Sequence, residues 1–419
     1  MTLSPPRPRP LTQHYARVRN RTTLLCEPLE REDYTVQPTP DVSPPKWHLG
    51  HSSWFFENFV LAQYQPGYRR FDERLNWFFN SYYESQGPRI LRSNRGNMTR
   101  PTLETILAYR DHVDAAMHEL LAGGDEEVYR LTELGLHHEQ QHQELLICDI
   151  KYILGTNPLY PSYRQREVQQ QLPSPLTFFE VPEGTYTVGY TGDSFSWDNE
   201  RSAHEVLVEP FGIASRLVTN GEYLEFMSAG GYSRFELWQM DGIAWARDLE
   251  IKAPLYWYPV DAGWKQYTLD RGLIEVDPHE PVTHLSWYEA DAYARWSGAR
   301  LATEFEWEIA CRSRHNGILP GGNWMEATTF HPRAAVDAQD DQMLGHAWEW
   351  TNSAYLPYPR YPRPEGALGE YNGKFMINQM VLRGGSCATA ASHMRISYRN
   401  FFQPDKRWQF TGIRLAKDL

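Results

Sequence analysis

The sequence has few cysteines, no excess of basic residues and no long apolar run. The four cysteines lie far apart without a CxxC pair, which indicates neither a disulfide framework nor a cysteine-based zinc site. Lys and Arg number 41 against 53 Asp and Glu, a formal charge of −12 that argues against a nucleic-acid partner. No segment approaches the roughly 18 apolar residues of a membrane span, and the Pro-rich start lacks a signal-peptide core. We therefore expect a cytoplasmic globular protein without a membrane partner, and at 419 residues about two to four domains.

The first part of the chain has the periodicity of long helices. Apolar residues between Leu103 and Leu120 recur at steps of three and four, which is typical of a helix with one buried face. Pro101 precedes this run and Gly123-Gly124 ends it. Three further helices are expected at 11–29, 46–65 and 125–155. Residues 1–154 are thus predicted to form a four-helix bundle.

The composition and periodicity of the sequence change after the predicted bundle. Residues 155–178 are rich in Pro, Gln and Ser without periodicity and are predicted to be a linker. Residues 179–419 are predicted to form an α+β domain with little regular secondary structure. Its short strands and helices are expected at 178–181, 185–188, 205–208, 220–227 and 287–297.

The strongest local signal is LHHEQQHQE at 136–144. His138 and His142 are four residues apart, so both imidazoles project from one helix face and could share a cation. An HxxxH pair is common without a metal, but His48 and His51 on a second predicted helix could add a ligand. The donors alone leave iron, zinc, copper and nickel open. Glu144 and Asp149 could support the ligands or be surface charges.

Two further segments could contact a ligand. Tyr82 and Tyr83 precede Arg89, Arg92 and Arg95, whose three-residue spacing could clamp a carboxylate. The alternatives are packing tyrosines and a solvated basic loop. Near the C-terminus, Asn400 precedes Phe401 and Phe402, an amide and two aromatic rings that could hold a substituted ammonium group or be ordinary core.

The motifs resemble a known combination of two domains. The first half resembles a DinB-type bundle. The second resembles the formylglycine-generating-enzyme (FGE)/sulfatase-modifying fold, a relative of C-type lectins, in the motifs LATEFEWEIAC (301–311), GHAWEWTNS (345–353), LRGGSC (382–387) and GIRLA (412–416). Together with LGH (49–51) and HEQQHQE (138–144), the chain resembles the EgtB-type sulfoxide synthases of ergothioneine biosynthesis from about residue 9 to 416.

This resemblance implies a reaction and the residues that perform it. The enzymes it points to use non-haem iron(II) and O2 to join hercynine to a thiol as a sulfoxide. Transferred residue by residue, it implies the metal ligands His51, His138 and His142, and the catalytic tyrosines Tyr82 and, second, Tyr83. It implies substrate contacts from Arg89, Arg92, Gln141, Asn400, Phe401 and Phe402.

The resemblance also has departures. Relatives that take γ-glutamylcysteine carry RNWD where this chain has Arg399 to Phe402, so loss of the Asp favours free cysteine as the thiol. The copper chemistry of FGE needs two cysteines, and here only Cys387 lies in that region.

The sequence motifs also leave other functions open. The same motifs fit a selenoneine synthase, which joins hercynine to a seleno-sugar. A DinB-type zinc or nickel thiol transferase would explain the histidines but not the second domain. A lectin-like binding module with a structural metal is the non-enzymatic reading. The sequence leaves the oligomeric state undetermined.

Overall fold

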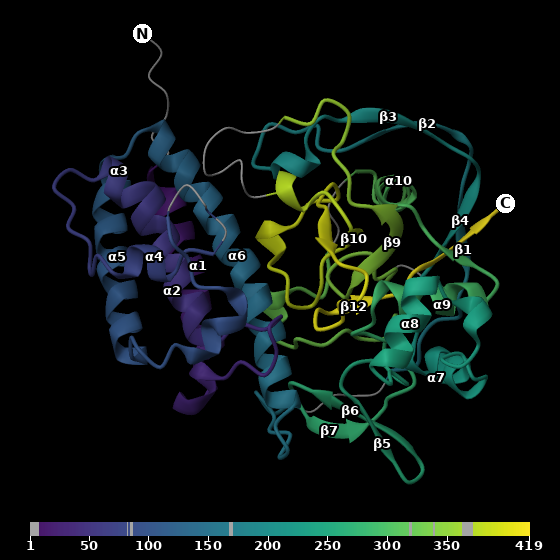
Figure 1. Ribbon diagram of the computed structural model, residues 1–419. Coiled ribbons are helices and arrows are strands. Elements are labelled where there is room, and N and C mark those ends of the chain that lie inside the picture. The colour runs from purple at the N-terminus through teal and green to yellow at the C-terminus, as the bar shows by residue number, and fades with distance from the viewer. Residues whose placement is uncertain are drawn as a thin grey trace. The chain divides into compact units, whose positions relative to one another are not determined.

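The computed structural model describes residues 8–81, 83, 87–166, 171–317, 321–337, 340–362 and 372–419. The described chain forms two compact units, and the main chain passes from one to the other after Thr156 (Figure 1). Among the described residues, no helix combines the length and apolar character that crossing a lipid bilayer requires.

The first unit contains the predicted four long helices. They are α1 (Pro8–Cys26), α2 (Pro45–Phe56), α5 (Leu103–Gly123) and α6 (Glu126–Gly155). α1 and α2 each pack against both α5 and α6, and Figure 1 shows the four lying side by side. The four-helix bundle predicted from periodicity is therefore confirmed. Shorter elements connect the long helices, namely η1 (Arg31–Thr35), η2 (Glu57–Leu61), α3 (Ala62–Tyr64), α4 (Leu75–Phe78) and η4 (Arg92–Asn97).

Two of the long helices, α5 and α6, begin where a side chain accepts hydrogen bonds from their first backbone amides. Asp125 caps α6 by accepting hydrogen bonds from the amides of Glu127 and Val128, at 3.1 and 3.0 Å. Thr102 caps α5 by accepting from the amide of Thr105. Such caps stabilise a helix start by about 1 kcal/mol. They explain why α6 begins directly after the Gly123-Gly124 break.

The end of α2 departs from regular α-helix. The helix predicted for 46–65 is present, but it runs through the π-helical turn η2 before α3. Glu57, at the start of this turn, is fully buried. Its carboxylate accepts hydrogen bonds from the hydroxyls of Tyr68 and Tyr109, each at 2.7 Å. Single π turns occur often beside functional sites, and apolar periodicity does not reveal them.

The second unit is built from small sheets. Their strands, in spatial order, are β1 (Phe178–Val181), β4 (Phe211–Ala214), β13 (Leu415–Asp418) and β8 (Arg300–Leu301); β11 (Asn400–Phe402), β10 (Met380–Arg383), β9 (Trp348–Ala354) and β12 (Thr411–Gly412); β2 (Gly184–Val188) and β3 (His204–Val208); and β5 (Trp257–Val260), β6 (Gly263–Thr268) and β7 (Gly272–Glu275). The three strands predicted near 178–208 are present as β1, β2 and β3. The last strand, β13, lies between β4 and β8, so the chain end completes the first sheet.

Short helices lie between these strands. They are α7 (Asn220–Ser228), α8 (Met240–Asp248), α9 (Trp287–Trp296) and α10 (Glu304–Arg314), with the single turns η5 (Asp198–Glu200), η6 (Phe235–Leu237), η7 (Met325–Ala327), η9 (Gly373–Phe375) and η10 (Ala391–His393). α7 and α9 match the predicted helices, whereas α8 and α10 were not predicted. α10 begins with a capping box, in which Thr303 and Glu306 each satisfy the other's backbone amide. The TEFE sequence is therefore a local signal that could have revealed it.

Buried ion pairs join the sequence motifs of the second unit. Glu304 accepts hydrogen bonds from Arg383 at 2.9 Å and from Arg399 at 2.8 Å. Arg414, in GIRLA, donates two hydrogen bonds to Glu349, in GHAWEWTNS, each at 2.7 Å. All five side chains are buried. Because a buried charge needs a partner, these motifs hold the core of an irregular domain together.

The segment predicted as a linker contacts the second unit. The amide of Tyr163 donates to the carbonyl of Leu269 at 2.8 Å, and the amide of Ser174 to that of Ala335 at 2.7 Å. Residues 157–166 and 171–178 therefore share backbone hydrogen bonds with the α+β domain. The domain limits 1–154, 155–178 and 179–419 stay a prediction.

Candidate metal centre

Three histidines from two helices converge inside the bundle. His51 lies on α2, and His138 and His142 lie on α6, one turn apart. One ring nitrogen from each lies within 4.8 Å of the others. The Nε2 atoms of His51 and His138 are 3.3 Å apart. That separation lets both bind one ion, since metal–nitrogen bonds to histidine are about 2.0–2.1 Å long.

His51 is held rigidly. Its ring is stacked between two indoles of its own helix, with centroids 5.5 Å from Trp47 and 5.4 Å from Trp54, at interplanar angles of 12° and 15°. Its Nδ1 lies 2.7 Å from the carbonyl oxygen of Phe79. A carbonyl can only accept, so Nδ1 carries the proton and Nε2 is left with a free lone pair. His51 is therefore held in an orientation in which its Nε2 could bind an ion.

The site favours neutral imidazoles. Burial lowers the pKa of His138 to about 4. Burial also lowers the pKa values of His51 and His142 well below the usual 6.5, and neighbouring imidazoles add to the effect. A metal ligand must be deprotonated, so these histidines are available to an ion at neutral pH.

A fourth histidine lies beside this set. His48 is buried on α2, and its Nδ1 is 3.0 Å from Nδ1 of His142. Its Nε2 lies 2.9 Å from Oδ2 of Asp149, a fully buried carboxylate on α6. Asp149 is thus a support for the histidine cluster rather than a surface charge. His48 and His51, three residues apart on α2, are thus both buried.

A buried network supports the α6 side of the site. Glu139, next to His138, accepts hydrogen bonds from Arg19 at 2.9 Å and from Arg110 and Thr22 at 2.6 Å each. Burial alone would raise the pKa of Glu139, but Arg110 and Arg19 outweigh it and lower this pKa to about 2. The ionised carboxylate of Glu139 therefore connects Arg19 on α1 and Arg110 on α5 to α6, the helix that carries His138 and His142.

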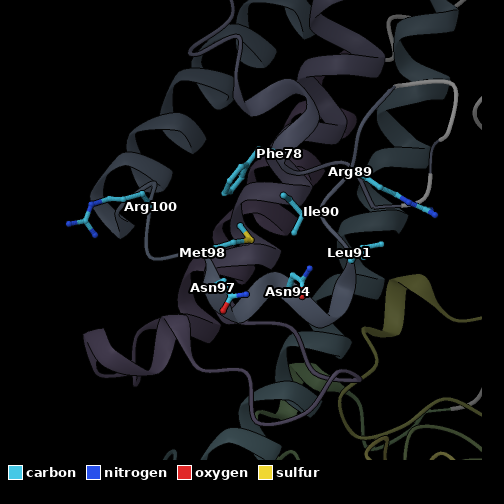
Figure 2. Close-up of a pocket in the computed structure, with 8 residues that line it drawn as sticks. All are labelled: Phe78, Arg89, Ile90, Leu91, Asn94, Asn97, Met98 and Arg100. Atoms are coloured by element: carbon cyan, nitrogen blue, oxygen red, sulfur yellow. The ribbon is translucent and has the colours of Figure 1, made fainter.

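The three predicted arginines differ in their surroundings. Arg89 is exposed and lines a cavity of about 320 Å³ within the bundle unit, together with Phe78, Ile90, Leu91, Asn94, Asn97, Met98 and Arg100. Figure 2 shows its guanidinium directed away from Phe78 and Ile90. Arg92 is half-buried and donates a hydrogen bond to the carbonyl of Asp41.

Arg95 is the buried member of this group. Its guanidinium lies over the indole of Trp47, 3.7 Å from the ring centroid, and it donates to Oγ of Ser43 at 2.8 Å. Because the same indole stacks on His51, the positive charge lies close behind the ligand set. The three-residue spacing left a carboxylate clamp and a solvated basic loop open for these arginines, and the structure buries Arg95 whereas Arg89 is exposed.

Two of the remaining bundle candidates, Tyr83 and Gln141, are described by the structure. Tyr83 is buried, and its ring contacts Trp54 and Phe59, with centroids 5.7 and 5.2 Å apart. Asn80 organises this segment, because its amide donates to the carbonyls of Tyr83 and Gly87 at 2.9 and 3.2 Å. Tyr82 lies outside the described residues. Gln141 is half-buried on α6, next to His142.

The C-terminal candidates belong to the second unit. Asn400, Phe401 and Phe402 form β11 and are half-buried. Phe401 stacks on Tyr355, with centroids 4.0 Å apart, and Phe402 contacts Trp408 edge-on at 5.1 Å. Both rings therefore have packing partners and keep part of their surface accessible.

Comparison with known proteins assigns both units. Residues 14–146 match the DinB superfamily, and residues 164–341 and 340–419 match the Sulfatase-modifying factor enzyme 1-like domain. A hercynine oxygenase from Mycobacterium tuberculosis is 30% identical, covering 98% of this chain and 99% of its own. This chain belongs to the hercynine oxygenase family. It is therefore an enzyme of the oxygenase type.

Other relatives match parts of the hercynine oxygenase fold. Ergothioneine biosynthesis protein 1 of Schizosaccharomyces pombe is 30% identical over 54% of this chain and 28% of its own. The bovine formylglycine-generating enzyme is 27% identical over 59% of this chain and 76% of its own. Hercynine oxygenases and FGE-like proteins are metalloenzymes, in agreement with the three converging histidines.

Proposed function

We propose that this member of the hercynine oxygenase family joins hercynine to a thiol in an O2-dependent reaction that yields a sulfoxide for ergothioneine biosynthesis. In this reaction the imidazole C–H and the thiol S–H are lost, and the C–S and S–O bonds form. O2 accepts four electrons, one oxygen entering the sulfoxide and the other leaving as water. The proposal rests on the convergence of His51, His138 and His142 in a chain 30% identical to a hercynine oxygenase over nearly its full length.

Iron(II) fits this donor set. Three neutral imidazoles bind first-row metals well and leave coordination positions open for substrates. Bound there, iron(II) would supply a redox-active centre that lowers the thiol pKa and transfers electrons to O2. All four cysteines are buried, and none forms a disulfide with another. That redox state also agrees with a cytoplasmic location.

Several residues are proposed to bind the substrates. Arg89 and Arg92 would hold the thiol substrate's carboxylate, for which guanidinium groups provide two parallel donors. Gln141 and Asn400 would orient hercynine through polar contacts. Phe401 and Phe402 would supply aromatic surface to its trimethylammonium group, a cation that aromatic faces bind favourably.

A phenol is proposed to move the proton. Tyr82 is our first candidate and Tyr83 the second, because each follows closely on Phe79, whose carbonyl contacts the ligand His51. A phenol beside the metal could deliver a proton as O2 is reduced. The packing of Tyr83 between Trp54 and Phe59 favours Tyr82 for this role.

Free cysteine is the proposed thiol. β11 carries Phe401 and Phe402 where relatives that use γ-glutamylcysteine have Trp and Asp, so an anion that could pair with a substrate ammonium is missing. Two aromatic rings cannot replace the full charge of that carboxylate.

The test is product analysis with iron-loaded protein, hercynine, O2 and either cysteine or γ-glutamylcysteine. We expect a product with one oxygen more and two hydrogens fewer than the sum of hercynine and cysteine, and faster turnover with cysteine. The mass should increase by a further two units with ¹⁸O2, and no product should form without O2. Failure to form a sulfoxide with either thiol would reject the proposed function. A clear preference for γ-glutamylcysteine would reject only the choice of thiol.

A further inference from the structure

A chain of hydrogen bonds runs from a buried carboxylate to one of the three metal-site histidines. Oδ2 of Asp149 lies 2.9 Å from Nε2 of His48, and Nδ1 of His48 lies 3.0 Å from Nδ1 of His142. His48 is 2% exposed and Asp149 is fully buried. The first contact joins α2 to α6 and the second returns to α6, seven residues earlier in the sequence.

The chemistry of the carboxylate determines the direction of these bonds. Asp149 also accepts a hydrogen bond from the amide of Ser43 at 2.9 Å, so its oxygen acts as an acceptor. The Nε2 atom of His48 therefore carries the proton. A neutral imidazole has one N–H, so Nδ1 of His48 is the acceptor toward His142. His142 must then donate from Nδ1, which leaves its Nε2 free to bind an ion.

Asp149, the carboxylate at the start of this hydrogen-bond chain, is itself held in place by its neighbours. Ser43, which donates its amide to Asp149, accepts through Oγ from Arg95 at 2.8 Å. Arg95 in turn lies over the indole of Trp47. The carboxylate of Asp149 is thus connected through Ser43, which precedes α2, and Arg95 to the indole of Trp47.

We propose that His48 and Asp149 are positioning residues that select the Nδ1–H tautomer of His142 and so aim its Nε2 at the metal. This inference rests on the proposed function in that His142 is a ligand. His51 obtains the same tautomer from the carbonyl of Phe79. The tautomers of two of the three proposed ligands are therefore set by different hydrogen-bond partners. A backbone carbonyl sets that of His51, and the His48–Asp149 pair sets that of His142.

Three substitutions at His48 separate the tautomer effect from packing. His48→Asn keeps an acceptor at the place of Nδ1, because its Oδ1 is the same number of bonds from the backbone. His48→Gln keeps a donor near the place of Nε2 but offers no acceptor at Nδ1, and His48→Leu removes both. His137→Leu is the matched control, because His137 is also a buried histidine of the bundle but lies outside this hydrogen-bond chain.

The measurement is Co²⁺ affinity of the full-length, metal-free protein by chelator competition. Supporting partners of metal ligands typically contribute about 10–100-fold in affinity, so His48→Leu and His48→Gln should weaken Co²⁺ binding by that factor. His48→Asn should bind more tightly than either, and His137→Leu should bind like the wild type. Asp149→Leu should weaken binding less than His48→Leu, since the acceptor on His48 remains.

A second readout reports the tautomer directly. In metal-free protein with ¹⁵N-labelled histidine, His142 should show a protonated Nδ1 in the wild type and in His48→Asn, and lose that preference in His48→Leu. Circular dichroism establishes that each variant is folded. Equal affinity of His48→Leu and wild type, or of His48→Asn and His48→Leu, would overturn the inference. Neither result depends on sulfoxide formation, so a failed product assay rejects the proposed function without affecting this outcome.

Discussion

The carbonyl oxygen of Phe79 accepts a hydrogen bond from Nδ1 of His51 at 2.7 Å. This contact links the metal-site helix α2 to the segment that continues through Asn80 to Tyr83. The backbone that orients a proposed ligand is therefore the backbone that leads to the proposed phenols. A shift of Phe79 is therefore expected to affect both the proposed metal binding and the proposed proton delivery.

Gly50→Ala is expected to produce such a shift. A Cβ atom at Gly50 would lie 2.3 Å from two ring atoms of Phe79, which is closer than any contact allows. Displacing the ring should lower the free energy of unfolding by about 1–3 kcal/mol and weaken Co²⁺ binding. Urea unfolding and chelator competition measure the two effects. Gly123→Ala, whose added methyl group meets open space, is the control. Unchanged metal affinity in Gly50→Ala would show that Phe79 does not orient His51.

Replacing the proposed proton donor should redirect the chemistry. Tyr82→Phe should divert the iron-loaded enzyme from sulfoxide formation towards plain thiol oxidation, because the phenolic proton is lost while the ring remains. Tyr83→Phe should have the smaller effect, since its ring is packed against Trp54 and Phe59. The ratio of sulfoxide to disulfide in the products measures the partition. Full sulfoxide yield in both variants would exclude a phenol from this step.

The metal-free protein should lose stability as the pH falls from 7 to 5. Burial lowers the folded-state pKa of His138 to about 4, from 6.5. In that window the unfolded chain therefore binds protons that the folded chain does not, and the free energy of unfolding falls as the pH decreases. His138 alone should contribute a loss of about 2 kcal/mol. Urea unfolding at both pH values measures this, and His138→Asn should flatten the slope. The same slope in that variant would assign the effect to other groups.

Neutralising Glu139 should destabilise the bundle. Its carboxylate accepts from Arg19 and Arg110, which are themselves buried, so Glu139→Gln removes the anion that the two guanidinium groups share, although Arg19 keeps its ion pair with Asp114. Removing one member of a buried ion pair costs about 3–5 kcal/mol. Glu127→Gln is the control on the same helix, because its ion pair with Arg130 is exposed and worth at most about 1 kcal/mol. Equal losses of stability in the two variants would contradict this account.

Local patterns predicted the bundle and much of its site. Apolar residues at steps of three and four follow the buried face of a helix, and α5 and α6 run where that face is continuous. The four-residue spacing of His138 and His142 places both on one face. The family motif added His51, and the structure brings it to the other two.

Features that depend on contacts between distant segments were not predicted. The contact of His48 with Asp149 requires the relative rotation of α2 and α6, which no spacing within either helix specifies. In the second unit, Glu304 and Arg383 are 79 residues apart in sequence, so their buried pairing leaves no local pattern. α10 is different, because its Thr303–Glu306 capping box was visible in the sequence.

The stacking of His51 between Trp47 and Trp54 places two fluorescent side chains directly beside the proposed metal site. Each indole ring centroid is about 5.5 Å or less from that of His51. A paramagnetic ion bound to this imidazole would sit within quenching range of two fluorophores. Tryptophan emission would therefore follow metal occupancy at the centre itself, without a dye, a substrate or turnover.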